Sequence, residues 1–569
     1  MSNVSKTNPA SIGHPSGLYV LFATEMWERF NFYGMRALLT LFLVNALRFL
    51  DKEASLLYGA FLGLCYLTPI AGGFISDRYL GNRRCIMLGG IIMSIGQLVL
   101  FFSGSLYSSN LGMATILMWI ALGLLIAGNG LFKPNISSMV GQLYPKGDPR
   151  LDSAFTIFYM GINLGAFLGI TICPLLGDVK VDEVRIVSAF KWGFLAGSIA
   201  MALGVIVFYL LKDKYLVTPD GKPVGEKSSA RSASDTQEGA ASFSRTSMLV
   251  GGICWLALMI AFYFIQKDIP IGSSSSVDLF ALIYSFIYAS GLTLAGLILT
   301  DSSLSKIERD RIATLYVVAF FVMFFWGCFE QAGSSLTFVA DYQTDTRVFG
   351  WDMPPSLVQN ANSLFIIIFA PIFGVLWLYL QKRSLEPISP VKQAIGLMLL
   401  SVGFLLIAFR VNGMGLTSKM GVGWLIAMYF FHTIGELCLS PVGLSLVSKL
   451  APVRFSSLLM GVWFLANAGG YALAGTIGAL LPPDGNKFNK ATELGLNLAG
   501  ILDRTVQVTT EQAALMKANN IPGKYPSIVG IEIHNLYEFF LVLSLFPGIA
   551  ALALFLLSFR LKKMMHGVR

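Results

Sequence analysis

The stretch GLYVLFATEMWERFNFYGMRALLTLFLVNALR, residues 17–48, decides the fold class of this chain. It is long and apolar enough to cross a bilayer core of roughly 30 Å, yet Glu25, Glu28 and Arg29 lie in its middle. An ionised side chain at the centre of a membrane helix costs about 2.5–3.5 kcal/mol, so it requires a partner or a water-filled cavity. The stretch therefore predicts a membrane-spanning helix that carries a functional charge cluster.

The composition and the distribution of apolar residues predict the same class for the rest of the chain. Of the 569 residues, 55% are hydrophobic and 13% are charged, whereas soluble domains carry about 25% charged residues. Segments such as 85–103 and 279–299 are nearly charge-free and long enough to span a bilayer. We expect an all-α membrane fold with fourteen spans, at about residues 17–48, 56–78, 84–103, 113–141, 152–177, 190–211, 247–266, 277–300, 312–340, 356–380, 391–410, 422–450, 456–481 and 532–560.

The positions of basic residues predict how these spans are oriented. Alternate loops, such as 78–84, and the tail at 560–569 are rich in Lys and Arg, and the loops between them are poorer. By the positive-inside rule, both termini and the basic loops are cytoplasmic, which agrees with an even number of spans. Lys180 and Arg185 are exceptions, because they fall on the outer side. The net charge of +9 thus reflects topology, and we expect no nucleic-acid partner.

Two segments are expected to lie outside the membrane. Residues 213–245 are rich in Ser, Gly, Lys and Asp and predict a flexible linker, while 482–531 is a long outer loop with helical periodicity near 509–519. The expected divisions are a cytoplasmic N-terminus at 1–16, a six-helix bundle at 17–211, a cytoplasmic linker at 212–246, two inserted helices at 247–300, a second six-helix bundle at 312–560, and a cytoplasmic tail at 561–569.

An internal repeat relates the two bundles. Pro134 and Pro441 are each followed by Ser at +4, Val at +6, Leu at +9 and Pro at +11. Pro69 and Pro371 match at nearly the same offset. Two parallel six-helix halves describe the major facilitator architecture, in which substrate binds near the bilayer midplane between the halves.

The charge cluster of the first span predicts proton handling. Glu25, Glu28 and Arg29 share one helical face, where Arg29 can pair with either carboxylate. One guanidinium cannot neutralise two carboxylates in a low-dielectric site, so we expect one of them to bind a proton on one side of the membrane and release it on the other. A fixed ion pair that only holds helices together is the alternative, and either carboxylate can be the proton carrier.

Further charges in both halves predict a site for a zwitterion. Arg36 and Lys133 would receive a carboxylate, and Glu436 an ammonium group. A salt bridge from Glu330 to either Lys133 or Arg36 would close the cavity on one side and break when the substrate carboxylate competes. His432 lies one turn before Glu436 and could pair with it, although packing is the plainer interpretation.

Aromatic residues and one loop complete the candidate site. We expect four aromatic side chains to line the cavity: Tyr33, Tyr66, Trp326 and Trp463. The loop GFISDRYLGNRR, residues 73–84, combines turn-forming glycines with charges near helix ends. It predicts gating contacts on the cytoplasmic side from Asp77, Arg78, Arg83 and Arg84. The six cysteines occur singly, which predicts neither a disulfide framework nor a metal site.

These motifs carry a resemblance to a known family. The pattern ExxERFxFYG at 25–34 resembles the first-helix signature of the proton-dependent oligopeptide transporter family, and FYMGINLG at 158–165 resembles its second signature. The loop at 73–84 is similar to the general major facilitator motif. The two extra central helices look like those of bacterial members. Phe32 and Ala166 replace a common tyrosine and a common serine, which could alter selectivity.

The resemblance implies a role for each candidate residue. Proton coupling and gating fall to Glu25, Glu28, Arg29 and Glu330, the peptide C-terminus to Arg36 and Lys133, the peptide N-terminus to Asn163, Asn362 and Glu436, and the pocket walls to Tyr33, Tyr66, Trp326 and Trp463. The implied protein is a monomeric, multi-pass symporter of the bacterial inner membrane that imports di- and tripeptides by alternating access. Its co-substrate is the proton gradient, and no cofactor is expected.

The sequence leaves other functions open. The same fold could carry nitrate, an amino acid or a drug-like metabolite. Members that move inorganic anions often lack an intact Glu-x-x-Glu-Arg set, so its presence favours a peptide substrate. A membrane enzyme lacks support, because the sequence has neither a His-Glu-x-x-His pair nor a phosphate-binding glycine loop.

Overall fold

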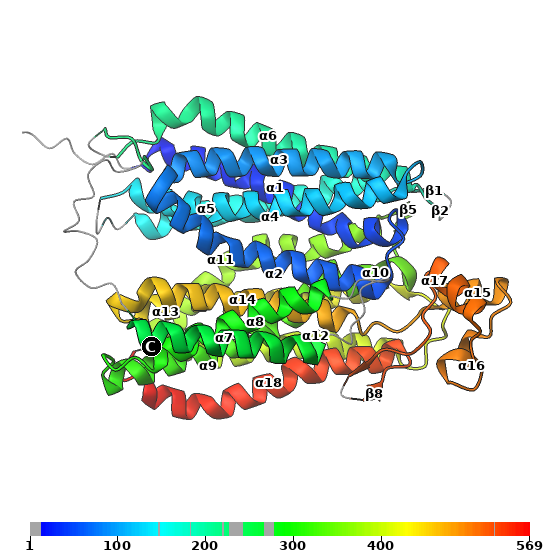
Figure 1. Cartoon of the computed structure of the whole chain (residues 1–569). Coiled ribbons are helices and arrows are strands. Elements are labelled where there is room, and N and C mark those ends of the chain that lie inside the picture. Colours follow the sequence, from blue (N-terminus) through cyan, green and yellow to red (C-terminus); the bar gives the residue numbers. More distant parts are fainter. Residues whose placement is uncertain are drawn as a thin grey trace, which may run out of the picture.

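The computed structural model describes residues 13–568 apart from 146–147, 149, 182–183, 219–220, 227–242, 267–277 and 529. Long helices run side by side and form one elongated bundle (Figure 1). The first described helix begins and the last helix ends at the same end of this bundle, which we call the terminal end. The opposite end carries the segment 482–531, and we call it the loop end.

The first half of the chain forms six long helices. Their bounds are Ser16–Asn45 (α1), Asp51–Ile75 (α2), Asn82–Leu106 (α3), Leu111–Gln142 (α4), Leu151–Gly177 (α5) and Phe190–Tyr215 (α6), with a π-helical extension of α2 at Ser76–Leu80. Gly165 and Gly169 of α5 lie against the backbone of α1, where any side chain would overlap Met26 and Phe30. Small residues at such contacts let membrane helices approach closely, and here they fix the rotation of α1 against α5.

The second half repeats this arrangement with more breaks. Its helices are Lys306–Phe329 (α9), Ser335–Tyr342 (α10), Asn360–Lys382 (α11), Ser389–Val411 (α12), Gly423–Leu450 (α13), Ser456–Gly478 (α14) and Leu536–Met564 (α18). A 3₁₀ turn at Glu330–Gly333 separates α9 from α10, and another at Pro355–Gln359 precedes α11. The second half has its own apolar core, largely separate from that of the first half.

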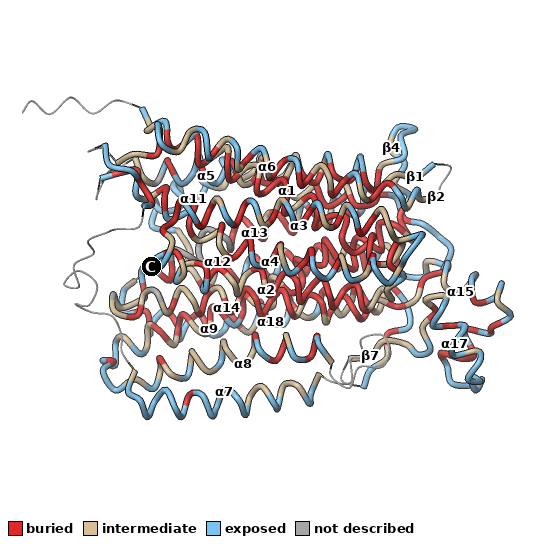
Figure 2. The backbone as a smooth tube through the Cα atoms, turned by 45° about the horizontal axis from the view of Figure 1, so that its top comes forward, coloured by how far each residue is buried: buried red, intermediate tan, exposed pale blue. Residues whose placement is uncertain are grey.

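A helical pair stands beside the bundle. It consists of α7, Arg245–Gln266, and α8, Leu279–Leu299. Figure 2 shows α7 at the margin with little of its surface buried, as a lipid-facing helix requires. The hydroxyl of Tyr284 on α8 donates to the carbonyl of Leu56 at 2.8 Å, and that of Tyr288 to the carbonyl of Gly469 at 3.4 Å. Thus α8 is bonded to both halves.

The segment 482–531 folds as a small unit at the loop end (Figure 1). Its helices are Gly485–Glu493 (α15), Leu498–Leu502 (α16) and Thr510–Ala518 (α17). Each begins after an N-cap residue whose side chain accepts a hydrogen bond from a backbone N–H of the first turn; these residues are Asp484, Asn497 and Thr509. Apolar residues of this unit form a separate core. The helical periodicity predicted near 509–519 is confirmed by α17, whereas α15 and α16 were not expected.

Short β-ladders occur in the connections between helices. They pair Lys180–Val181 (β1) with Val184–Arg185 (β2), Thr344–Asp345 (β3) with Met420–Gly421 (β6), Arg347–Val348 (β4) with Trp351–Asp352 (β5), and Ser527–Ile528 (β7) with Ile531–Glu532 (β8). Only the β3–β6 pair is parallel among the described residues. The connections at the loop end are therefore ordered by backbone bonds as well as by side chains.

The chain is an all-helical membrane protein, but the predicted count of fourteen spans is not confirmed. Within the described residues, 12 helices are long and apolar enough to cross a membrane. The helix α1 is not among them because it carries Glu25, Glu28, Arg29 and Arg36. In α13, the segment Gly423–Leu439 counts only as a shorter apolar helix.

Candidate functional site

A cavity of about 300 Å³ lies between the two halves, lined by α1, α2, α4 and α5 on one side and α9, α11, α13 and α14 on the other. Its walls include every residue predicted to bind substrate: Tyr33, Arg36, Tyr66, Lys133, Asn163, Trp326, Asn362, Glu436 and Trp463. Glu25, Arg29 and Glu330 line the same cavity. The structure thus brings together side chains as distant in the sequence as Glu25 and Trp463.

The charged trio of α1 forms one buried network. The Nε of Arg29 pairs with Oε1 of Glu25 at 3.0 Å and also contacts Glu28. Glu28 is fully buried and accepts a bond from Nδ2 of Asn129 on α4 at 3.4 Å, whereas Glu25 reaches the cavity wall. Two carboxylates therefore share one guanidinium in a site from which water is largely excluded.

Arg36 and Glu330 form a salt bridge across the two halves. The Nη1 of Arg36 donates to both carboxylate oxygens of Glu330, at 3.0 and 2.9 Å. Both side chains are buried, and the Arg36 guanidinium also stacks 4.8 Å from the centroid of the Tyr33 ring. The sequence left Lys133 and Arg36 open as the partner of Glu330, and in the structure the partner is Arg36.

Lys133 has a different partner. Its Nζ lies 3.6 Å from the centroid of the Tyr66 ring, a cation–π contact inside the cavity. Tyr66 in turn packs against Tyr471 of α14 with ring centroids 4.4 Å apart, and Trp326 also packs against Tyr471, with ring centroids 5.8 Å apart. A chain of aromatic rings therefore runs from the first half to the second beneath the cations.

The opposite wall carries the carboxylate of Glu436. Its Oε2 accepts a bond from Nδ2 of Asn362 at 3.0 Å, and Asn362 is held in turn by the hydroxyl of Thr433 at 3.0 Å. His432 instead packs on Phe404, with ring centroids 4.5 Å apart. The packing interpretation of His432 therefore fits the geometry better than a pair with Glu436.

Two predicted wall residues have less direct roles in this geometry. Asn163 lies in the cavity wall, where its Nδ2 donates to the carbonyl of Tyr159 in its own helix at 2.9 Å. Trp463 is buried and borders the cavity on the α14 side.

Gln359 also lines the cavity, and its buried amide has no hydrogen-bond partner among the described residues. Sequence reasoning missed Gln359 because it lies in a 3₁₀ turn outside any motif.

Of the four residues predicted to form gating contacts, Arg83 alone is buried. Its guanidinium donates to the carbonyls of Val224 and Leu216, both at 2.6 Å, and pairs with Asp213 at 2.8 Å. It therefore anchors the C-terminal end of α6 and the chain that follows it. The other three, Asp77, Arg78 and Arg84, are exposed at the terminal end.

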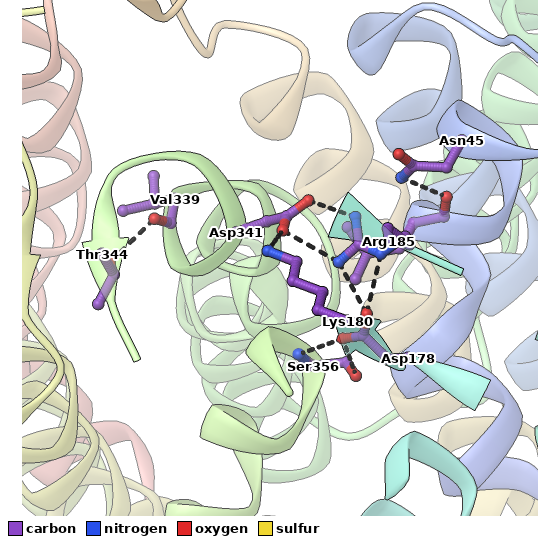
Figure 3. Close-up of polar contacts among 9 residues, drawn as sticks. Asn45, Asp178, Lys180, Arg185, Val339, Asp341, Thr344 and Ser356 are labelled. Carbon is purple, nitrogen blue, oxygen red and sulfur yellow. Dashed lines mark hydrogen bonds and ion pairs between the residues drawn. The ribbon is translucent and has the colours of Figure 1, made fainter. Parts of the chain in front are cut away.

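An ion-pair network lies at the loop end and is drawn in Figure 3. Asp341, at the end of α10, pairs with Arg185 at 2.6 Å and with Lys180 at 2.6 Å. Arg185 also pairs with Asp178 at 2.7 Å, and Asp178 accepts bonds from the backbone N–H and the hydroxyl of Ser356 at 3.0 and 2.7 Å. Since Asp341 and Ser356 belong to the second half, this network joins the halves.

Sequence reasoning did not find this network, although it left a signal. Lys180 and Arg185 were exceptions to the positive-inside rule. Arg185 has one acidic partner close in the sequence, Asp178, but the partner that it shares with Lys180 is Asp341, more than 150 residues away and too far for any local pattern. Among the described residues, no group of three His, Cys, Asp or Glu side chains could hold a metal ion.

The chain is similar in sequence and in fold to known membrane transporters. The POT family pattern matches residues 83–494. The chain is similar to the uncharacterized transporter YclF of Bacillus subtilis, with 35% identity over 86% of this chain and 93% of that protein. It is similar to the di-/tripeptide transporter of Lactococcus lactis subsp. cremoris, with 31% identity over 87% and 94%. It also resembles a crystal structure of a POT family transporter in complex with 5-aminolevulinic acid, with 28% identity, a TM-score of 0.70 and 97% of both chains covered.

Proposed function

The chain belongs to the POT family of peptide transporters, and from this premise we propose that it imports di- and tripeptides together with protons. The observation that carries the proposal is the separation of charge across the cavity. Arg36 and Lys133 stand on the wall of the first half, and Glu436 stands on the wall of the second. A relative of known substrate, the transporter of Lactococcus lactis, is named for the same substrates.

A short peptide matches this arrangement because its carboxylate and ammonium groups lie at opposite ends. The carboxylate would bind Arg36 or Lys133, and the ammonium would bind the carboxylate of Glu436, which Asn362 orients. A volume of about 300 Å³ suits a small ligand. The aromatic walls offer apolar surface to side chains without a hydrogen-bond pattern that would select one of them.

Proton coupling is assigned to the trio of α1. A proton on Glu25 or Glu28 would leave the other carboxylate paired with Arg29, so the cluster would alternate between one net negative charge and none. Glu25 reaches the cavity and Glu28 does not face it, which favours Glu25 as the group that exchanges protons with cavity water. A substrate carboxylate at Arg36 would compete with Glu330 and so loosen a contact between the halves.

We extend the proposal to the topology. The helices α1 and α13 join the twelve apolar spans to give fourteen, because the charges of α1 are paired inside the protein. Both termini are cytoplasmic and the loop end faces outward, in the cell membrane. Each half then rocks about the central cavity, Asp77, Arg78, Arg83 and Arg84 act on the cytoplasmic side, and the monomer is the working unit.

Uptake by proteoliposomes tests the proposal. With an inward proton gradient, the wild type should accumulate radiolabelled dialanine. Glu25→Gln and Glu28→Gln should abolish accumulation, while exchange of labelled for unlabelled dialanine without a gradient survives in at least one of them. Glu493→Gln, an exposed carboxylate of α15, is the control and should behave as the wild type. Uptake that ignores the proton gradient would refute the coupling.

A second candidate is transport of another small zwitterion. The similar structure that contains 5-aminolevulinic acid favours it, since that molecule also carries separated ammonium and carboxylate groups. Competition assays separate the two. Inhibition of 5-aminolevulinic acid uptake by dialanine and trialanine at low concentration supports peptides, whereas potent inhibition by single amino acids alone supports the alternative. Nitrate is the weaker rival because it lacks the cationic end that Glu436 would bind.

A further inference from the structure

Tyr58 of α2 contacts the gating carboxylate, although no motif singled it out. Its side chain is fully buried, and its hydroxyl donates to Oε2 of Glu330 at 3.1 Å. The same oxygen accepts the Nη1 of Arg36 at 2.9 Å. Glu330 belongs to the second half, whereas Tyr58 and Arg36 reach it from two different helices of the first half.

The turn that bears Glu330 is fixed against Tyr58 by its backbone. Gly333 lies so close to the Tyr58 hydroxyl that any side chain at this position would overlap it. The hydroxyl of Thr40 on α1 donates to the carbonyl of Gly333 at 3.0 Å. The 3₁₀ turn after α9 is therefore held from both sides, and the Tyr58 hydroxyl cannot leave Glu330 without a shift of the turn.

Tyr58 and Arg36 differ in what they can offer a carboxyl group. A guanidinium only donates hydrogen bonds, so Arg36 makes a charge-assisted contact with both oxygens of ionised Glu330, whereas protonated Glu330 offers it only a weaker, neutral acceptor. A phenolic hydroxyl both donates and accepts, so Tyr58 can donate to the carboxylate and accept from the carboxylic acid. Other groups near Glu330 are Tyr66 of α2, Tyr429 and Glu436 of α13, and Tyr471 of α14.

We propose that Tyr58 is a positioning residue for Glu330, which it holds in place in both protonation states so that a proton on Glu330 releases Arg36 without loss of the turn. The inference rests on the proposed function, in which Arg36 binds the substrate carboxylate, and it adds Glu330 to the α1 trio as a group that binds a proton. No covalent bond of Tyr58 changes: the proton comes from cavity water, binds a Glu330 oxygen and leaves to water. The hydroxyl rotates from donor to acceptor.

Tyr58→Phe tests this role in proteoliposomes. The variant loses a hydrogen bond to a charged group, so proton-driven dialanine uptake should fall about tenfold or more, with a shifted pH profile, while exchange without a gradient changes about twofold at most. Tyr284→Phe is the matched control, because it removes a hydroxyl bond of an equally buried tyrosine that also contacts α2. Equal losses in both variants, or equal losses of driven uptake and exchange, would overturn the proposal.

A double-mutant cycle with Glu330→Gln keeps the test independent of the substrate. Thermal unfolding of the purified wild type, Tyr58→Phe, Glu330→Gln and the double variant measures the coupling between the two side chains. A coupling that differs between about pH 5 and about pH 8 supports the proposal, even where dialanine proves to be the wrong substrate. Additive effects at both pH values would refute it. Absence of dialanine uptake by the wild type would instead refute the proposed function.

Discussion

Asp341→Asn should release the loop end of the protein. The Asp341 carboxylate is the centre of the network in Figure 3, where it pairs with Lys180 at 2.6 Å and with Arg185 at 2.6 Å. An Asn side chain keeps the shape and can accept one hydrogen bond, but it removes the charge that opposes two cations. The substitution therefore destabilises the closed state, in which Asp341 pairs with the two cations. It leaves the open state unchanged, because these pairs are absent there.

The magnitude follows from what each cation retains. Removal of one partner from a buried ion pair costs about 3–5 kcal/mol. Arg185 keeps Asp178 at 2.7 Å, and the Lys180 side chain is 25% exposed, so each is partly compensated. We therefore expect about 2 kcal/mol, which is about a thirtyfold change in the ratio of closed to open loop ends. If about 1% of wild-type molecules have an open loop end, about a quarter of the Asp341→Asn molecules should have one.

Spin labels report this ratio directly. Cysteines at Trp192 of α6 and Trp424 of α13 would place labels on exposed positions of the two halves near the loop end. Of the native cysteines, Cys254 is exposed and the others are buried, so Cys254→Ser gives a suitable background. Pulsed electron–electron double resonance in nanodiscs should show a population of Asp341→Asn with a longer distance between the two labels. The parent protein should lack this population.

The control for this experiment is Asp352→Asn. Asp352 pairs with Arg347 at 3.0 Å, but both side chains are more than half exposed and both lie in the second half. Such a surface pair contributes about 0–1 kcal/mol and does not join the halves, so the distance distribution should not change. A distribution for Asp341→Asn identical to the parent would refute the assignment of the network as the closing contact. An equal shift in the control would refute it too.

Three further changes have definite expected outcomes. Glu436→Gln should raise the KM for dialanine about tenfold or more in uptake assays, with little effect on binding of N-acetyl-dialanine, which has no ammonium group. Burial and the nearby Asp51 raise the pKa of Asp484, so the 482–531 unit should lose stability as the pH rises through that pKa; Asp484→Asn should increase hydrogen-exchange protection of α15–α17 at neutral pH and remove its pH dependence. Gly165→Ala should lower the thermal unfolding temperature because its methyl group meets the α1 backbone, whereas Gly123→Ala, in open space on α4, should not.

The sequence predicted the helices and the chemistry of the cavity for the same physical reason. Apolar runs of membrane length are unmistakable, and charges inside them are expensive enough to mark a function. The sequence alone therefore places the main charged residues in one site, and in the structure they line one cavity: Glu25, Arg29, Arg36, Lys133 and Glu436. The internal repeat added the division into halves.

What the sequence did not predict lies in pairings and in ordinary residue types. A tyrosine in a membrane helix is usually a packing residue, so Tyr58 carried no signal of its contact with Glu330. The partner of Glu330 was open between Lys133 and Arg36, because that choice depends on helix rotation. The helices α15 and α16 are short and stabilised by their caps and a local core, which hydropathy does not detect.

The two networks that join the halves share one arrangement of charge. In both, a carboxylate of the second half meets cations of the first: Glu330 meets Arg36, and Asp341 meets Lys180 and Arg185. The proposed site follows the same rule, except that a substrate carboxylate takes the place of a protein carboxylate. A substrate in the central cavity would compete with Glu330 for Arg36 but would not contact Asp341, which does not line that cavity. Binding would therefore weaken the inner contact while the loop end stays closed, and reopening of the loop end requires the separate loss of the Asp341 pairs.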